Sequence, residues 1–117
     1  LSLYGKWFLT EYGYSPGSGY VTTKVNPEPP LYVTFGLDEH MSSNIGEFET
    51  FEYFKIVTNE ESDRTSLLLF SEKPDETLSL FEQTGRSYSV TQKRDLLKLN
   101  YYGCIEGCHL GFKPANL

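Results

Sequence analysis

Turn-forming segments recur at short and fairly even intervals along the chain, and this spacing limits the possible folds more than any other feature. Seven segments rich in Gly, Pro, Asn, Asp or charged residues lie at 14–19, 26–30, 36–40, 59–63, 72–76, 83–86 and 93–95. The apolar or alternating runs between them predict about eight to ten strands, at 4–13, 20–25, 31–36, 40–45, 48–58, 65–71, 77–82, 86–93, 95–102 and 108–113.

These strands are predicted to pair antiparallel. Connections of a few residues are too short for the crossover helices that parallel strands need, so neighbours in sequence form an up-and-down meander. A meander of about eight to ten strands removes its exposed edges when it closes into a barrel. The sequence therefore predicts an all-β fold, an antiparallel up-and-down meander closed into a barrel, with residues 1–117 forming a single domain.

Alternation of apolar and polar residues predicts which side chains point into this barrel. Leu97, Leu99 and Tyr101 share one face of their strand, and the polar residues between them share the other. The same pattern places a larger set inside: Trp7, Leu9, Leu31, Val33, Phe35, Phe54, Ile56, Leu78, Leu80, Tyr88, Val90, Leu110 and Phe112. Glu11 falls on the face of Trp7, so its carboxylate is expected inside the barrel or at its mouth.

The charge balance argues against a nucleic-acid partner. The chain has 10 Lys and Arg residues against 16 Asp and Glu residues, and the basic residues are scattered among the acidic ones along the sequence. Binding to a phosphate backbone needs a positive field, which such a chain is not expected to provide.

No apolar run in the sequence approaches the roughly 20 residues that cross a bilayer as a helix.

Three segments carry a family resemblance. Gly5, Lys6 and Trp7 form a Gly-x-Trp motif on the first strand, "YVTFGLDEHMSS" reads as strand, acidic turn and strand, and "CIEGCHLGFK" ends the chain's last hairpin. Together they resemble the lipocalin-like domains of small bacterial cell-envelope lipoproteins. The resemblance implies a calycin-type barrel with Trp7 across its closed end and a ligand inside. It also implies export to the periplasm or cell surface, with membrane contact only through a lipid anchor upstream of this sequence.

The two cysteines, Cys104 and Cys108, have a spacing that fits a clasp on the last hairpin. Gly107 suits the positive φ that a three-residue turn often requires, and opposed strand residues lie within disulfide range. A redox pair would have two-residue spacing near a helix start, and a metal would need more ligands than His40 and His109 provide. Free thiols and a metal or redox role stay open as alternatives. A structural disulfide would indicate an oxidising compartment, the periplasm or the cell exterior.

No catalytic or metal-binding pattern is present in the sequence. The chain has no Gly-rich phosphate loop and no nucleophile elbow, and its acidic stretches lack the ligand spacing of a calcium loop. We therefore expect no enzymatic activity, no cofactor and no metal. Glu11 has two interpretations: a carboxylate of raised pKa that anchors a polar head group in the barrel, or a solvated residue beyond the barrel rim.

Two functions follow from these expectations. The first is binding of a small apolar or amphipathic ligand in the barrel interior, by Trp7, Leu9, Glu11, Val33, Phe35, Phe54, Tyr88, Leu97, Leu99 and Tyr101. The alternative is a non-enzymatic structural or protein-interaction domain, whose barrel is packed by its many aromatic side chains. Its partner would be another envelope protein, and outward-facing Phe51 and Tyr53 would form the contact patch. A structure without an internal cavity would exclude the first function.

Overall fold

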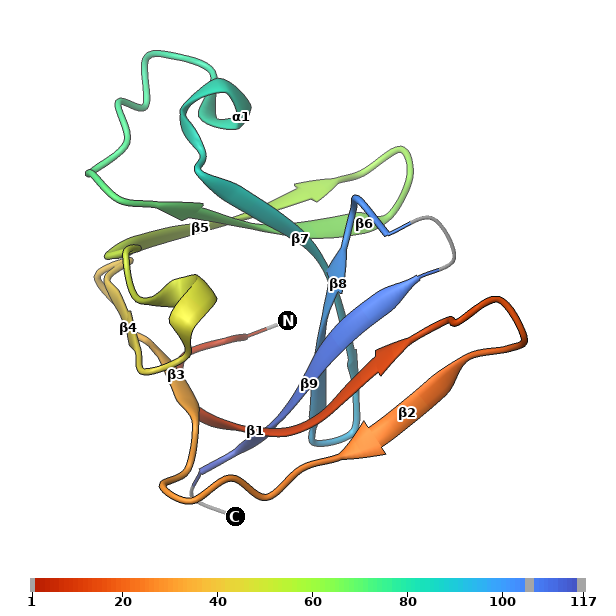
Figure 1. The fold of residues 1–117 in the computed structure, drawn as a ribbon. Helices are drawn as coiled ribbons and strands as arrows, with labels where there is room; N and C mark the ends of the chain where they lie inside the picture. The colour runs from red at the N-terminus through yellow and green to blue at the C-terminus, as the bar shows by residue number, and fades with distance from the viewer. Residues whose placement is uncertain (1, 105–106, 116–117) are drawn as a thin grey trace.

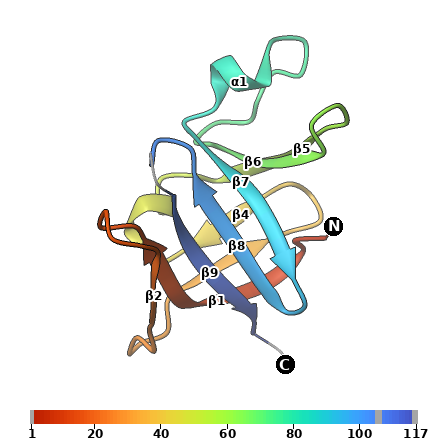
Figure 2. The ribbon, with the colours of Figure 1, turned by 90° about the vertical axis from the view of Figure 1, so that its right-hand side faces the viewer.

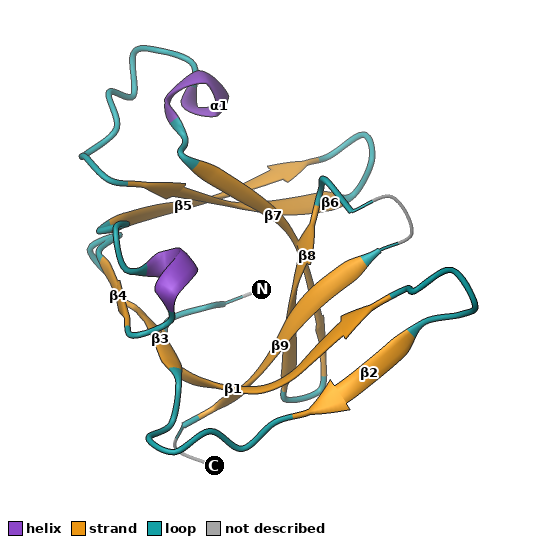
Figure 3. Ribbon diagram, in the orientation of Figure 1, coloured by secondary structure: helices purple, strands orange, loops and turns teal. Residues whose placement is uncertain are grey.

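The computed structural model describes residues 2–104 and 107–115, and its strands form one nine-stranded sheet (Figure 1 and Figure 3). The strands are β1 (Gly5–Tyr14), β2 (Val21–Lys24), β3 (Tyr32–Phe35), β4 (Met41–Ser43), β5 (Tyr53–Asn59), β6 (Arg64–Phe70), β7 (Arg86–Lys93), β8 (Leu96–Tyr101) and β9 (Cys108–Pro114). Two short helical turns lie between strands, η1 (Gly46–Phe48) and α1 (Leu80–Gln83).

The sheet curls into a nearly closed antiparallel barrel, which confirms the predicted fold class. Its order is β4-β3-β1-β9-β8-β7-β6-β5, and β2 pairs with β1 beside β3. The first and last strands, β1 and β9, are neighbours. The remaining gap, between β4 and β5, is spanned by a single bridge of His40 with Tyr53. The Met41 amide also donates a hydrogen bond of 2.9 Å to the Glu52 carbonyl across this gap.

Most side chains that alternation places inside the barrel do form its core. Nine of them are buried: Trp7, Val33, Phe35, Phe54, Tyr88, Val90, Leu97, Leu99 and Phe112. Five more are partly buried and pack against this core: Leu9, Leu31, Ile56, Tyr101 and Leu110. The period of two therefore predicts the inner face well wherever a regular strand has a paired neighbour on each side.

The predicted strand at 77–82 was wrong. The segment is a loop that ends in α1, and Leu78, expected inside, is 60% exposed. The loop is held by its own polar groups, because the Gln83 side chain accepts a hydrogen bond from the Asp75 amide and donates one to the Asp75 carbonyl, both of 2.8 Å. The segment has no strand to pair with, since β6 and β7 pair directly with each other.

The predicted strand at 48–58 begins later than expected. Its first residues belong to η1 and a turn, and β5 starts only at Tyr53. Phe51 is partly buried and packs against the core, and half-buried Tyr53 lies against the His40 ring at a centroid distance of 4.6 Å. The two aromatic residues therefore do not form the exposed contact patch that the sequence suggested.

A β-bulge in β1 changes the face on which Glu11 lies. Before the bulge Leu9 pairs with Phe112, whose side chain is in the core, and after it Glu11 pairs with Gly111. Since adjacent residues of β9 point to opposite faces, Glu11 lies on the outer face of the barrel and not on the face of Trp7. The expected inside position of Glu11 was wrong because the alternation slips by one residue at the bulge.

Cys104 and Cys108 form a disulfide, with their Cα atoms 5.8 Å apart. Gly107 has a φ of 93°, the left-handed conformation that the sequence predicts for this turn, and residues 105 and 106 lie outside the described residues.

Among the residues that the structure describes, no helix is long and apolar enough to cross a membrane.

Candidate functional site

Most of the residues predicted to bind a ligand inside the barrel pack against one another in its core. Seven of them are buried in one cluster, and Leu9 and Tyr101 pack against it. Aromatic rings meet in this core: the Phe35 and Phe54 centroids are 4.8 Å apart, and those of Tyr88 and Tyr101 are 5.3 Å apart. The space between these core side chains has a volume of about 0 Å³. It is lined by Val33, Phe35, Met41, Phe48, Leu67, Leu69 and Leu99.

Both ends of the barrel are also occupied by the chain itself. At one end Leu3 is 1% exposed, and its carbonyl accepts a hydrogen bond of 2.9 Å from the Trp7 indole. At the other end η1 places Phe48 against Tyr88, with centroids 5.6 Å apart. Figure 2 shows the N-terminal segment and η1 at opposite ends of the barrel.

Glu47 of η1 fixes this second end with hydrogen bonds that the sequence did not predict. Its two carboxylate oxygens accept hydrogen bonds of 2.6 Å from the hydroxyls of Tyr88 and Tyr101, and Arg86 donates one of 3.0 Å. Burial raises the pKa of both tyrosines, and the bonds to Glu47 raise it further. Both hydroxyls therefore stay protonated as donors, and their polar ends are satisfied within the chain.

Replacing Tyr101 by Phe is expected to lower the free energy of unfolding by about 2 kcal/mol. The change removes a hydrogen bond to a carboxylate and leaves the ring in place. Urea unfolding followed by circular dichroism measures the change. The matched control is Tyr4→Phe, at a hydroxyl on a residue that is 50% exposed, which should alter stability little. Equal stabilities of the two variants would contradict the role of Glu47 as a cap on the barrel end.

A second polar cluster lies on the outer face, over β1 and β9. Glu11 and His109 are 3% and 2% exposed, and the imidazole Nε2 is 2.8 Å from a carboxylate oxygen. Lys24 of β2 pairs with the other oxygen at 2.7 Å. Tyr20 stacks on the imidazole, and its hydroxyl is hydrogen-bonded to Nδ1. Gly111 makes room for this arrangement, because a Cβ there would lie 2.9 Å from the Glu11 carboxyl carbon.

The partners of Glu11 determine its ionisation. Burial alone would raise its pKa, but the hydrogen bonds with Lys24 and His109 and the positive charge of Lys24 outweigh burial, so the pKa lies below the ordinary value of 4.5. Neither interpretation of Glu11 from the sequence holds, because its pKa is lowered rather than raised and its side chain is buried rather than solvated. The carboxylate is committed to two partners of its own chain rather than offered to a ligand.

The lowered pKa of Glu11 predicts an acid-dependent loss of stability. In the unfolded chain this carboxyl takes up a proton near its ordinary value of 4.5, and in the folded protein only at lower pH. Its stabilising contribution is thus complete above about pH 5 and disappears as the pH falls through the folded pKa. Thermal unfolding between pH 3 and pH 7 should show Glu11→Gln to be less stable at neutral pH, with the difference narrowing below about pH 4.5. A constant difference would contradict this assignment.

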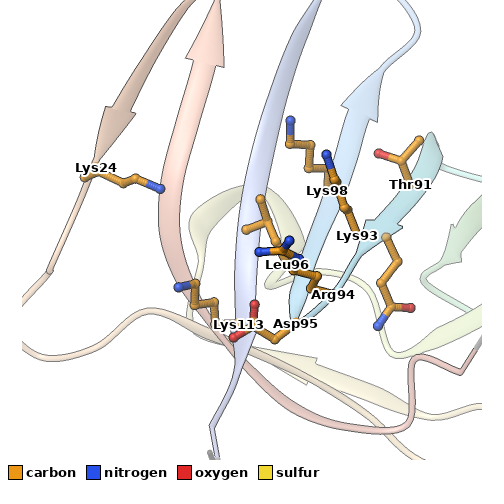
Figure 4. Close-up of a pocket in the computed structure, with 9 residues that line it drawn as sticks. Lys24, Thr91, Lys93, Arg94, Asp95, Leu96, Lys98 and Lys113 are labelled. Carbon is orange, nitrogen blue, oxygen red and sulfur yellow. The ribbon is translucent and has the colours of Figure 1, made fainter.

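Beside this cluster, the outer face carries a basic groove, which we define by its lining residues: Lys24, Thr91, Gln92, Lys93, Arg94, Asp95, Leu96, Lys98 and Lys113. Its volume is about 510 Å³. Five of the ten basic side chains of the chain line it, with one of the sixteen acidic ones. Figure 4 shows Lys24 on one side and Lys93, Arg94 and Lys98 on the other, with Lys113 between them.

Strand register explains why residues distant in sequence meet in the basic groove. Lys98 pairs with Thr91 on one side and with Gly111 on the other, and the same row continues to Glu11 and Lys24. The next row contains three groove residues, since Lys93 pairs with Leu96 and Lys113 lies two residues beyond Gly111 on the same face. The expectation that the basic residues are scattered holds along the sequence but not in the folded sheet.

Among residues 2–104 and 107–115, no three His, Cys, Asp or Glu side chains gather in a way that could hold a metal ion.

Comparisons with protein-family models, with curated proteins and with solved structures find no match for this chain. The functional interpretation therefore depends on the geometry of the barrel interior and of the outer face.

Proposed function

We propose that this chain is a non-enzymatic binding domain, a lipocalin-like barrel that serves as a packed scaffold and contacts its partner through its outer surface. The observation that carries the proposal is the filled interior, where the space beside Leu99 has a volume of about 0 Å³. A barrel that encloses a small ligand needs a cavity of about 300 Å³ or more. The packing therefore favours the interaction domain over the carrier of an apolar ligand.

The absence of catalysis is part of the proposal. The contact between Glu11 and His109 has the residue types of an acid–base pair, but both side chains are buried under Tyr20 and Lys24, and Glu11 is already paired with Lys24. A general base must reach a proton of the substrate directly or through one water molecule. Burial of both groups favours a structural role, which is to hold β2 against the sheet.

Export from the cytosol is also proposed. The disulfide between Cys104 and Cys108 is consistent with the periplasm or the cell surface, because reducing compartments keep such thiols free. The resemblance to envelope lipoproteins supports the same compartment. In that setting the partner would be another molecule of the cell envelope.

Titration of the lone Trp with apolar ligands tests the proposed function. Trp7 packs in the barrel core, so any ligand that enters the interior would change its fluorescence. We expect fatty acids, bile acids, quinones and haem at micromolar concentration to give no saturable change and no rise in melting temperature. Saturable quenching by one of them, with a matching rise in melting temperature, would overturn the packed scaffold and restore the interior ligand.

A further inference from the structure

We propose that the basic groove binds a soluble compound carrying two or more phosphate groups. This inference extends the proposed function, because it names the chemistry that the outer surface recognises. The groove is concave, with a volume of about 510 Å³. That volume lies within the range of about 300 to 1,000 Å³ found for small-molecule sites.

Four of the five positive charges in the groove have no ion-pair partner within the described residues. Lys24 is paired with Glu11, but within the described residues no ion pair includes the four other cations, Lys93, Arg94, Lys98 and Lys113. One carboxylate, Asp95, lines the same surface. Four like charges gathered on one face repel one another, and this repulsion is relieved when an anion binds between them. The groove is thus positive although the protein as a whole has a formal net charge of −6.

The positions of the cations favour a ligand with several anionic groups. They extend from β2 to the β7–β8 hairpin, and neighbouring strands are about 4.8 Å apart, so Lys24 and Lys98 start from backbones about 14 Å apart. A single phosphate group is too small to contact both sides of such a groove. The four unpaired cations and the single negative charge of Asp95 give this part of the groove a net charge of +3. Each phosphate carries a charge of about −1.5 to −2, so two phosphates roughly balance this positive charge.

Phosphate also suits the residue types in the groove. Lys is a compact point charge with three donors and is a frequent phosphate ligand, and four of the five cations are Lys. Thr91 and Gln92 add neutral hydrogen-bond donors at the same surface. The groove thus offers both charge and directional bonds to phosphate oxygens.

Two other partners of similar charge fit the groove less well. A membrane-binding surface carries exposed apolar side chains that insert beside the cations, whereas Leu96 is the one aliphatic side chain among the lining residues. Single-stranded nucleic acid is held by aromatic side chains on which bases stack, and the lining contains none. A soluble, compact phosphate compound therefore remains the best occupant.

Isothermal titration calorimetry with sodium tripolyphosphate tests the proposal on the whole chain at low salt. We expect saturable binding to one site, weakened by added salt because the contacts are exposed ion pairs. The variant Lys98→Gln/Lys113→Gln should bind about tenfold more weakly, since it removes two phosphate contacts. The matched control Lys73→Gln removes a positive charge outside the groove and should bind like the wild type. Melting temperatures establish that each variant is folded.

Further ligands separate the possible sources of the negative charge. Citrate supplies several carboxylates in place of phosphates, and phosphatidylcholine vesicles with about one fifth phosphatidic acid supply phosphate on a membrane. The proposal is overturned if tripolyphosphate does not bind, if Lys73→Gln loses as much affinity as the groove variant, if citrate binds as tightly, or if vesicles alone bind. Failure here would leave the packed scaffold intact, because uptake of apolar ligands tests that claim separately.

Discussion

Replacing Leu99 by Trp is expected to lower the free energy of unfolding by about 3 kcal/mol. Leu99 is completely buried and borders a central space with a volume of about 0 Å³, so a larger side chain has no empty volume to enter. Its neighbours Val33 and Phe48 would have to move, together with the strand and the η1 turn that carry them. Insertion of extra atoms into a packed core typically costs about 1 to 3 kcal/mol, and Trp is the largest insertion available.

The control for this experiment is Leu37→Trp, which makes the same chemical change at a side chain that is 81% exposed. It should leave the urea midpoint close to that of the wild type. A Leu99→Trp variant as stable as Leu37→Trp would contradict the packed interior, because it would mean that the barrel holds enough free volume for an indole ring. That outcome would again favour a carrier of small ligands.

Replacing Gly111 by Ala is expected to cost about 3 kcal/mol as well. The added Cβ would lie 2.9 Å from the Glu11 carboxyl carbon and 3.2 Å from one of its oxygens, so the carboxylate would have to move. Glu11 would then lose its hydrogen bonds with His109 and Lys24, and a hydrogen bond to a charged group contributes about 1.5 to 3 kcal/mol. Denaturant unfolding of the variant at neutral pH measures the loss.

Gly46→Ala provides the matched control, because a Cβ at that position would meet no atom within 4 Å. We expect this variant to be about as stable as the wild type. The loss of stability in Gly111→Ala should also shrink below about pH 4.5, as the carboxylate is protonated and its bonds weaken. Equal stabilities of the two Ala variants would show that Glu11 is not held over Gly111 as described.

The strand pattern predicted the barrel because its strands obey a simple local rule. In β8 the alternation of Leu97, Leu99 and Tyr101 with polar residues coincides with the observed inner and outer faces. The rule failed where the backbone departs from regular pairing. The bulge of β1 moved Glu11 to the outer face, and no residue type in the sequence marks a bulge unambiguously. Apolar Leu78 alternated like a strand residue but has no strand to pair with.

The basic groove could not be predicted from composition, because charge was counted along the sequence rather than across the sheet. Lys24 and Lys98 are 74 positions apart and lie in the same cross-strand row only because β1 pairs with both β2 and β9. Pairing of the first strand with the last needs the closed topology, which local patterns do not determine. The cap formed by Glu47 was missed for a similar reason, since its tyrosine partners come from distant strands.

The packed interior and the basic groove are two consequences of one sheet. Inner-facing residues of β8 and β9, such as Leu99 and Phe112, fill the barrel, and outer-facing residues of the same strands, Lys98 and Lys113, line the groove. A rigid, filled core holds the backbone beneath the cations in place, so little ordering is needed when an anion binds. Stability and binding in this chain are therefore expected to respond to different substitutions.

The most direct test of the packed scaffold is a crystal structure determined under xenon pressure. Xenon enters dry apolar cavities in proteins and is readily seen by diffraction. We expect no xenon atom in the space bounded by Val33, Phe48 and Leu99, because that space has a volume of about 0 Å³. An ordered xenon atom at this position would contradict the filled barrel and would show that its interior can receive a ligand.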